Sequence, residues 1–268
     1  MIDKNGYEFE FAEKETGFVE EATAQVDQME INKIYNMDCL QGMKGIPDKS
    51  VDMILADLPY GTTRNKWDSI IPLDPLWEQY ERVIKDNGAI VLTAQTPFDK
   101  VLGVSNLKHL KYEWIWQKDS GTGFLNSKKM PLKDHENILV FYKKPPTYNP
   151  QMRTGFKPYT TTKGHHGTNY GADKGATTSS DGERYPLTTM KFPRDANKLH
   201  PTQKPVALFE YLIKTYTDEG AIVLDNVMGS GTTAIACLET NRNYIGFEIE
   251  KGYFEIANKR IDEYKKER

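Results

Sequence analysis

Short apolar runs alternate with amphipathic segments along most of the chain. Runs rich in valine, isoleucine and leucine predict seven strands, at residues 33–38, 51–58, 89–94, 112–118, 137–143, 221–227 and 243–250. Apolar residues spaced three and four apart predict five helices, at 74–85, 97–106, 205–216, 232–239 and 253–265. Alternation of strand and helix is typical of a mostly parallel sheet with helices on both faces.

The segment between the strands expected at 112–118 and 137–143 has no helical pattern. Strands joined without a helix pair in antiparallel fashion, so we expect an antiparallel pair at one edge of the sheet. The predicted fold is therefore α/β, with a mostly parallel seven-stranded sheet between two layers of helices. With 268 residues, 38% of them apolar, the chain can form one such domain with an inserted lobe, or two small domains.

The apolar runs are far shorter than the roughly 20 residues that cross a bilayer. The acidic N-terminal segment has no signal-peptide core, and we expect a cytoplasmic protein without a membrane partner. Cys39 and Cys237 lie far apart in the sequence, and neither has nearby partners for a metal cluster. His165 and His166 also lack acidic or cysteine partners, so we predict neither a disulfide nor a metal site.

Charge is segregated along the chain, although the net charge is only −3. Residues 1–30 hold nine acidic and two basic residues, which predicts a flexible extension. Residues 143–198 hold ten Lys or Arg and four Asp or Glu in a stretch rich in Gly, Thr, Pro and Tyr. This composition predicts a basic, loop-rich lobe, and charge alone fits a solvated insertion as well as a nucleic-acid surface.

Three predicted strands end in chemically unusual residues, at the edge where open α/β sheets bind ligands. One end reads Asp57-Leu58-Pro59-Tyr60, and another runs from Asp225 through Gly229-Ser230-Gly231 into a helix. The third is Glu248, 19 residues after Gly229. A glycine turn admits close backbone approach, and a carboxylate after the next strand can accept hydrogen bonds from ribose hydroxyls. Together they indicate a nucleoside site, although a glycine turn made only for packing has the same sequence.

The first strand end combines hydrogen-bond acceptors with an aromatic ring. Pro59 has no N–H, so nearby carbonyls can face a ligand, and Asp57 adds a carboxylate. Tyr60 offers a flat face for stacking. Acceptors beside a stacking ring suit a planar amine, whereas the plainer interpretation is a strand-ending turn. If both strand ends serve one reaction, the Asp57 turn and the glycine turn must face each other across a shared cavity.

The order of these motifs resembles that of the β class of DNA amino-methyltransferases. Asp-Leu-Pro-Tyr is followed by a basic variable segment, then His200-Pro201-Thr202-Gln203-Lys204-Pro205, Gly-Ser-Gly-Thr-Thr and Gly246-Phe247-Glu248. The resemblance runs from about residue 31 to the C-terminal helix. It implies a Rossmann-like methyltransferase fold with circularly permuted motifs. The catalytic half is then 31–144, the target-recognition insertion 145–198 and the cofactor half 199–268.

The resemblance also implies roles for individual residues. Asp57, Leu58, Pro59 and Tyr60 match the catalytic tetrapeptide that holds a flipped base, with Leu58 in place of a proline. The residues expected at S-adenosylmethionine are Asp38, Cys39, Thr202, Lys204, Asp225, Met228, Gly229, Ser230, Gly231, Thr232 and Glu248. Asn226-Val227 replaces the Pro-Phe of the family, which puts one stacking contact to the cofactor in doubt. The basic residues expected at double-stranded DNA are Arg64, Lys66, Lys118, Lys128, Lys129, Arg153, Lys157, Arg184, Lys191 and Arg194.

We therefore expect a DNA methyltransferase that acts on the 6-amino group of adenine, because Asp57 opens the tetrapeptide. Methylation of a ring carbon would need a cysteine next to proline, and Cys39 and Cys237 are each followed by leucine. The open alternatives are transfer to the 4-amino group of cytosine or to a protein glutamine, a nicotinamide-dependent oxidoreductase, and a silent DNA-binding module. The resemblance also raises a homodimer and a cognate restriction endonuclease as partners, which the residues themselves do not decide.

Overall fold

The computed structural model describes residues 29–61, 68–162, 177–195 and 203–267. The acidic extension therefore lies outside the described residues, except for its last two positions. The same holds for Arg64, Lys66 and Thr202 among the predicted site residues. Within the described residues, no helix is both long enough and apolar enough to span a membrane.

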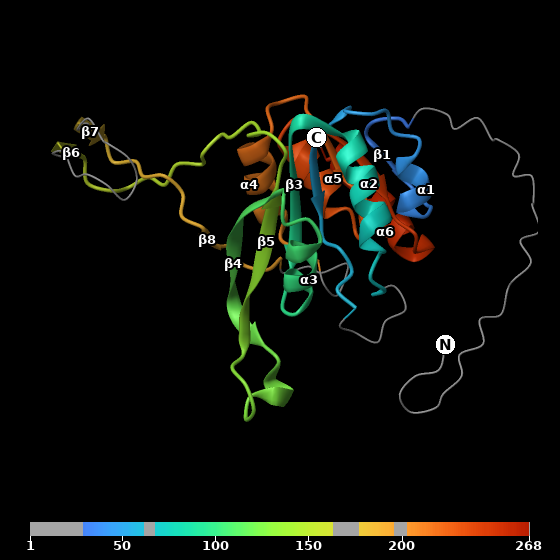
Figure 1. Ribbon diagram of the computed structural model, residues 1–268, viewed down its shortest axis with the longest axis horizontal. Helices are drawn as coiled ribbons and strands as arrows, with labels where there is room; N and C mark the ends of the chain where they lie inside the picture. Colours follow the sequence, from blue (N-terminus) through green and yellow to red (C-terminus); the bar gives the residue numbers. More distant parts are fainter. Residues whose placement is uncertain (1–28, 62–67, 163–176, 196–202, 268) are drawn as a thin grey trace, which may run out of the picture.

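The core of the fold is an eight-stranded sheet (Figure 1). In spatial order its strands are β1 (Lys33–Tyr35), β10 (Asn243–Phe247), β9 (Ile222–Asp225), β2 (Val51–Ala56), β3 (Ile84–Ala94), β5 (Lys133–Phe141), β4 (Leu110–Thr122) and β8 (Thr189–Lys191). The five strands from β1 to β3 run parallel. β5 pairs antiparallel with both β3 and β4, which confirms the predicted antiparallel pair.

The predicted number of seven strands is wrong by one. The additional strand is β8, which pairs in parallel with β4 at the edge of the sheet. β8 has only three residues, Thr-Met-Lys, and a segment this short shows no readable alternation. It forms because β4 offers an open edge of backbone donors and acceptors.

Helices cover both faces of the sheet, as predicted. They are α1 (Cys39–Met43), α2 (Leu73–Val83), α3 (Phe98–Ser105), α4 (Val206–Tyr216), α5 (Thr232–Glu239) and α6 (Lys251–Lys266). Successive residues of β2 point to opposite faces. Met53 and Leu55 belong to the core cluster that contains residues of α4, α5 and α6. Ile54 and Ala56 belong to the cluster with α1, α2 and α3.

Strands β2 and β9 are direct neighbours, although they come from opposite halves of the chain. Met53 pairs with Val223 and Ile54 with Leu224, in parallel register. The carboxyl ends of the two strands therefore meet at one edge of the sheet. This pairing brings the Asp57 turn and the glycine turn together.

Two parts of the chain extend beyond the layered core (Figure 1). One is the arm formed by the far ends of β4 and β5, closed by a 3₁₀ turn, η1 (Phe124–Asn126). The other is the predicted insertion, in which β6 (Tyr159–Thr162) and β7 (Thr177–Ser180) form a separate two-stranded sheet. Most described side chains of the insertion are exposed, and Met190 of β8 is its only described apolar side chain buried in the core.

Candidate active site

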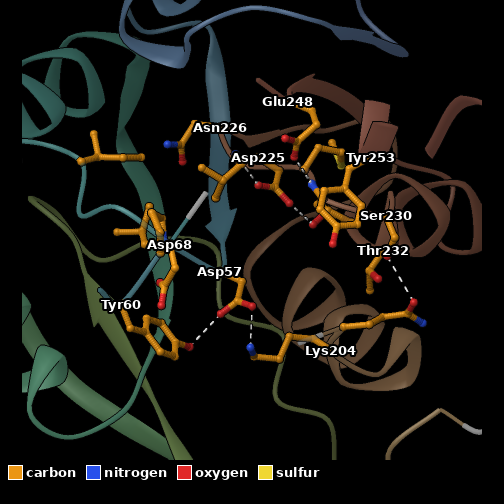
Figure 2. A pocket seen from close by; sticks show the side chains of 18 of the residues that line it. Asp57, Tyr60, Asp68, Lys204, Asp225, Asn226, Ser230, Thr232, Glu248 and Tyr253 are labelled. Atoms are coloured by element: carbon orange, nitrogen blue, oxygen red, sulfur yellow. Dashed lines mark hydrogen bonds and ion pairs between the residues drawn. The ribbon is translucent and has the colours of Figure 1, made fainter. Parts of the chain in front are cut away.

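A cavity of about 670 Å³ opens at the carboxyl ends of β2, β9 and β10. The Asp57 turn lines one side, and the glycine turn with Glu248 lines the other, so the two turns share one cavity as expected. Figure 2 shows Asp57, Tyr60 and Lys204 across the cavity from Ser230 and Glu248. The volume lies within the range of roughly 300–1,000 Å³ that is typical of sites for organic ligands.

Asp57 follows β2 directly and is held by three donors. The Tyr60 hydroxyl donates to Oδ1 across 2.7 Å, and the Thr93 hydroxyl of β3 donates to the same oxygen. Lys204 Nζ donates to Oδ2 across 2.5 Å. Burial, followed by the negative charge of Asp57, raises the pKa of Tyr60 well above its ordinary value, so the phenol keeps its proton and remains a donor.

The Tyr60 ring is supported from outside the cavity. Phe98, the first residue of α3, stacks on Tyr60 with ring centroids 5.5 Å apart and an angle of 27° between the rings. Phe98 is itself buried. The orientation of the Tyr60 ring is therefore fixed both by this stacking contact and by the hydrogen bond of its hydroxyl to Asp57.

Lys204 lies buried between two carboxylates. Its Nζ is 2.5 Å from Asp57 and 3.3 Å from Oε2 of Glu136, a residue of β5. Lys118 of β4 pairs with the other oxygen of Glu136 across 2.6 Å. Burial alone would lower the pKa of Lys204, but the charges of Asp57 and Glu136 outweigh it and raise that pKa. Burial opposes ionisation of Glu136 as well, yet Lys204 and Lys118 bring its pKa below the ordinary value.

Glu136, Thr93 and Phe98 also shape the Asp57 turn, and the sequence does not single them out, because each sits within an ordinary strand or helix pattern. One signal was available for Glu136. It is a charged residue just before a buried apolar run of β5, and such a residue needs a partner.

The glycine turn is stabilised by its own backbone and by two carboxylates. Gly229 and Gly231 have φ values of 54° and 82°, which other residues rarely adopt. The Asp225 side chain accepts a hydrogen bond from the Val227 amide and another from the Thr233 hydroxyl. Glu248 accepts from the Gly229 amide across 2.7 Å. The turn is thereby tied to the ends of both β9 and β10.

The two carboxyl groups at this turn have altered acidity. Burial, helped by the nearby charges of Asp57 and Glu248, raises the pKa of Asp225 from 3.8 to about 7, although its hydrogen bonds from Thr233 and Val227 act to lower it. Burial also raises the pKa of Glu248 above its ordinary value. Close to neutral pH, Asp225 is therefore divided between its neutral and its charged form.

Asp38 and Cys39 form the start of α1 at a further wall of the cavity. Asp38 caps the helix by accepting a hydrogen bond from the Gln41 amide across 3.0 Å. The Asn226 side chain donates to the sulfur of Cys39 across 3.5 Å and accepts from the Tyr80 hydroxyl across 2.5 Å. Asn226, which departs from the Pro-Phe pattern, thus links α1, α2 and β9 through a buried polar chain.

The structure brings most of the predicted site residues into the cavity. Its lining includes Asp38, Cys39, Asp57, Leu58, Pro59, Tyr60, Lys118, Arg194, Lys204, Asp225, Met228, Gly229, Ser230, Thr232 and Glu248. Gly231 shapes the turn without lining the cavity. Lys204, expected at S-adenosylmethionine, forms an ion pair with Asp57, and Lys118, expected at DNA, forms one with Glu136.

The other described residues that were predicted at DNA do not line the cavity. Lys128 and Lys129 are exposed on the arm beyond η1. In the insertion, Arg153 and Arg184 pair through their backbones, and the Arg184 guanidinium lies 4.4 Å from the centre of the Tyr159 ring. Lys157 is exposed, and so is Lys191 on β8. Apart from Lys191, these basic side chains lie on the two parts that project from the sheet.

Comparison with known proteins gives consistent matches over this region. Residues 51–259 match the family described as DNA methylase. The type II methyltransferase M.BglII of Bacillus subtilis is 30% identical over 263 residues, covering 85% of this chain and 68% of the relative. The DNA adenine methyltransferase YhdJ of Escherichia coli strain K12 is 30% identical over 250 residues, covering 87% and 83%.

Solved structures of similar proteins share the fold. The complex of M1.HpyAVI with SAM has a TM-score of 0.58 at 27% identity and covers 85% of this chain and 98% of that one. The cytosine-N4-specific PvuII DNA methyltransferase has a TM-score of 0.64 and covers 87% of each chain. Its identity is 14%, so this second likeness concerns the fold alone.

Proposed function

Because this chain belongs to the DNA methylase family, we propose that it transfers a methyl group from S-adenosylmethionine to the 6-amino group of a flipped-out adenine in duplex DNA. One observation carries the proposal. The Asp57 turn, with its acceptors and its aromatic ring, shares a cavity with the glycine turn and Glu248. A site for a planar amine therefore lies beside a site for a nucleoside.

The residues on the glycine side fit S-adenosylmethionine. Gly229 leaves its part of the turn without a side chain, and a Cβ there would meet no atom closer than 4.0 Å. The Glu248 carboxylate accepts one backbone hydrogen bond on each oxygen, from Gly229 and Glu250. A carboxylate has about four acceptor positions, so Glu248 can still receive both ribose hydroxyls. In this proposal Asp38 and Cys39 border the adenine of the cofactor, and Met228, Ser230 and Thr232 border its methionine part.

The residues on the other side fit the target base. Phe98 covers one face of the Tyr60 ring, so in our proposal the base stacks on the other. Tyr60, Thr93 and Lys204 use three of the roughly four acceptor positions of Asp57, which leaves room for one hydrogen of the amine. The Leu58 carbonyl accepts the second hydrogen, and the fixed backbone of Pro59 holds the turn that presents it.

These contacts address the main chemical difficulty of the reaction. The lone pair of an exocyclic amine is delocalised into the aromatic ring, so the nitrogen is a poor nucleophile. Acceptors at Asp57 and Leu58 favour a pyramidal nitrogen, whose lone pair can then point at the donor. When bound, S-adenosylmethionine supplies an electrophilic methyl group on a sulfonium, and its sulfur keeps the electron pair of the broken bond. Asp57 then takes the proton that the methylated nitrogen releases, and positioning supplies much of the acceleration.

The choice of adenine over cytosine rests on Asp57 and on the adenine methyltransferase among the relatives. The test is to express the protein in a host without DNA methylation and to digest the host DNA to nucleosides. Mass spectrometry should detect N6-methyladenine. N4-methylcytosine would instead support the cytosine alternative, and unmodified DNA would overturn the proposal.

The oxidoreductase alternative predicts a different ligand for the same glycine turn. A thermal-shift measurement with S-adenosylhomocysteine should raise the unfolding temperature, whereas NAD should leave it unchanged. Stabilisation by NAD alone would favour the oxidoreductase. The protein glutamine alternative is tested by digestion of labelled protein after incubation with a tritiated methyl donor.

Further partners belong to this proposal. The basic residues of the insertion and the arm, among them Arg153, Arg184 and Lys128, are proposed to contact DNA phosphates. The relatives named type II methyltransferases support a cognate restriction endonuclease, and the test is protection of methylated DNA from cleavage. Self-association into a homodimer is tested by sedimentation equilibrium. The cytoplasmic location stays a prediction.

A further inference from the structure

The arm formed by β4 and β5 ends in apolar side chains that point into solvent. Leu125 is 101% exposed and Phe124 is 71% exposed, and both belong to η1. Met130, on the returning side of the arm, is 51% exposed. Figure 1 shows this end of the arm projecting well beyond the sheet. Such a cluster of large exposed apolar side chains marks a surface that meets a partner.

The tip holds its shape through its own backbone rather than through apolar packing. Asn126 donates to the Gly123 carbonyl across 2.9 Å, and Lys129 donates to the Asn126 carbonyl across 2.8 Å. Gly123 has a φ of 91°, in the left-handed region, which lets β4 turn into η1. Leu125 is thus presented on an ordered turn. Binding through it costs less conformational entropy than ordering a flexible loop would.

The charge around the tip favours a polyanionic partner. The fourteen residues from Ser120 to Lys133 contain three lysines and no acidic residue. Two of these lysines, Lys128 and Lys129, are exposed beside η1. Duplex DNA offers the matching combination, because its phosphates lie outside and its stacked apolar base faces lie inside.

The position of the arm connects it to the proposed chemistry. Lys118 and Thr122 of β4 line the same cavity as Asp57. Leu125 follows Thr122 by three residues, which corresponds to at most about 10 Å of extended chain. The apolar tip therefore projects from the rim of the cavity into which a flipped base would pass.

We propose that Leu125, supported by Phe124, enters the base stack at the place that the target adenine vacates. Lys128 and Lys129 contact the flanking phosphates. An unpaired gap in a duplex costs a few kcal/mol of lost stacking, and an inserted apolar side chain offsets part of that cost. The arm then stabilises the flipped state. This inference rests on the proposed function, because it assumes that the substrate base leaves a duplex.

The test uses the full chain and a duplex that contains the methylated motif, identified by sequencing DNA from expressing cells. 2-Aminopurine at the target position reports flipping by a rise in fluorescence. For Leu125→Ala we expect a smaller rise and a kcat/KM for DNA about tenfold lower, in keeping with a loss of roughly 1–2 kcal/mol of stacking. Leu125→Phe should retain most of the activity. Leu107→Ala, at another strongly exposed leucine outside the arm, is the matched control and should behave as the parent does.

A second duplex distinguishes insertion of Leu125 into the base stack, which we call the wedge, from a simple contact of Leu125 with DNA. If the target adenine lies opposite an abasic site, flipping costs less, and the defect of Leu125→Ala should shrink to within about twofold of the parent. An equal defect on both duplexes would overturn the wedge, as would full activity of Leu125→Ala on the paired duplex. Binding of the parent to anionic vesicles that is lost in Leu125→Ala, with methylation unchanged, would assign the tip to a membrane and would also overturn it.

Failure of this inference is distinguishable from failure of the proposed function. If the parent protein leaves DNA unmethylated, the proposed function fails. If the parent methylates DNA and Leu125→Ala equals it, only the wedge fails. Binding of S-adenosylhomocysteine, which should be the same in all the arm variants, confirms that each variant is folded.

Discussion

Lys204 donates a hydrogen bond to Asp57 across 2.5 Å, although the inserted lobe separates the two residues in the sequence. Asp57 follows β2 directly in the first half of the chain, and Lys204 precedes α4 in the second. The buried ammonium gives the proposed catalytic carboxylate a charged partner and a fixed direction. Lys204 also pairs with Glu136 of β5, and Glu136 in turn pairs with Lys118 of β4.

Replacement of Asp57 should separate chemistry from cofactor binding. Asp57→Ala removes the proposed acceptor for the target amine but leaves the glycine turn untouched. We expect methyl transfer to fall at least about 100-fold, as when a directed polar contact is removed from other active sites. Transfer of a tritiated methyl group to duplex DNA measures the loss. S-adenosylhomocysteine should bind as tightly as before, and a matching loss of that binding would contradict the assigned role.

Replacement of Lys204 should damage both stability and activity. Lys204→Met leaves the carboxylates of Asp57 and Glu136 buried without their shared cation, so unfolding should become easier by about 3 kcal/mol. The pKa of Glu136, which Lys204 helps to lower, should rise. Activity of the variant should therefore be lost at a higher pH than that of the parent on acidification. Chemical denaturation and a pH–rate profile measure these effects.

The control for this variant is Lys214→Met. Lys214 is a partly exposed residue of α4 that pairs with Glu210, one turn away on the same helix. Its loss should change the free energy of unfolding by less than about 1 kcal/mol. If both lysine variants behaved alike, a special role for Lys204 would be untenable.

Glu248 should control cofactor affinity. Glu248→Gln keeps the size of the side chain, but an NH₂ group that cannot accept replaces one of its two oxygens, which accept from the Gly229 and Glu250 amides respectively. Loss of one charged hydrogen bond to a ribose hydroxyl corresponds to about 1.5–3 kcal/mol, so affinity for S-adenosylmethionine should fall at least about tenfold. Isothermal titration measures it. Glu255→Gln, on an exposed part of α6, should have the affinity of the parent.

Asp225 should make stability depend on pH in an unusual direction. Its pKa rises from 3.8 in the unfolded chain to about 7 in the folded one. The folded state therefore holds the proton more tightly, and the contribution to stability is complete below about pH 4 and is lost as the pH rises to 7. Asp225→Asn does not titrate. The unfolding temperature of the parent should therefore fall relative to that of this variant as the pH rises over that interval.

Asp86 should show the opposite dependence of stability on pH. Its hydrogen bonds with Lys144 and Lys49 lower the pKa of its carboxyl group from 3.8 to about 2. The contribution of Asp86 is present above pH 4 and is lost as the pH falls towards 2. The difference between the parent and Asp86→Asn should therefore shrink with acidification. If the parent lost stability relative to both variants on acidification, the raised pKa of Asp225 would be contradicted.

The parts of the fold that could be predicted are those with local patterns. β2 is an apolar run interrupted only by Asp52, and α4 has apolar residues at helical spacing, so both were predicted close to their observed bounds. The strand-end residues were found because parallel strands place their ligand-binding ends at one edge. The positions of Asp57 and Glu248 at this edge could therefore be predicted from the sequence and this rule alone.

The parts that were missed depend on tertiary contacts. β8 exists only through pairing with β4, and α1 is a five-residue helix that begins at the Asp38 cap. Strand β3 begins at Ile84, five residues before the predicted start. The pairing of Lys204 with Asp57 and Glu136 could not be read from the sequence, since no local pattern specifies which buried charges will meet.

The pairing of β2 with β9 makes the two halves of the chain one cooperative unit. Only two residue pairs, Met53 with Val223 and Ile54 with Leu224, form this junction, yet it lies in the middle of the sheet. A fragment that contained either half alone would expose an unpaired strand edge and half of an apolar core. We therefore expect separately expressed halves to aggregate alone and to reassemble when produced together. Insertions of different length between the two halves should be tolerated, because the pairing of β2 with β9 lies outside the inserted lobe.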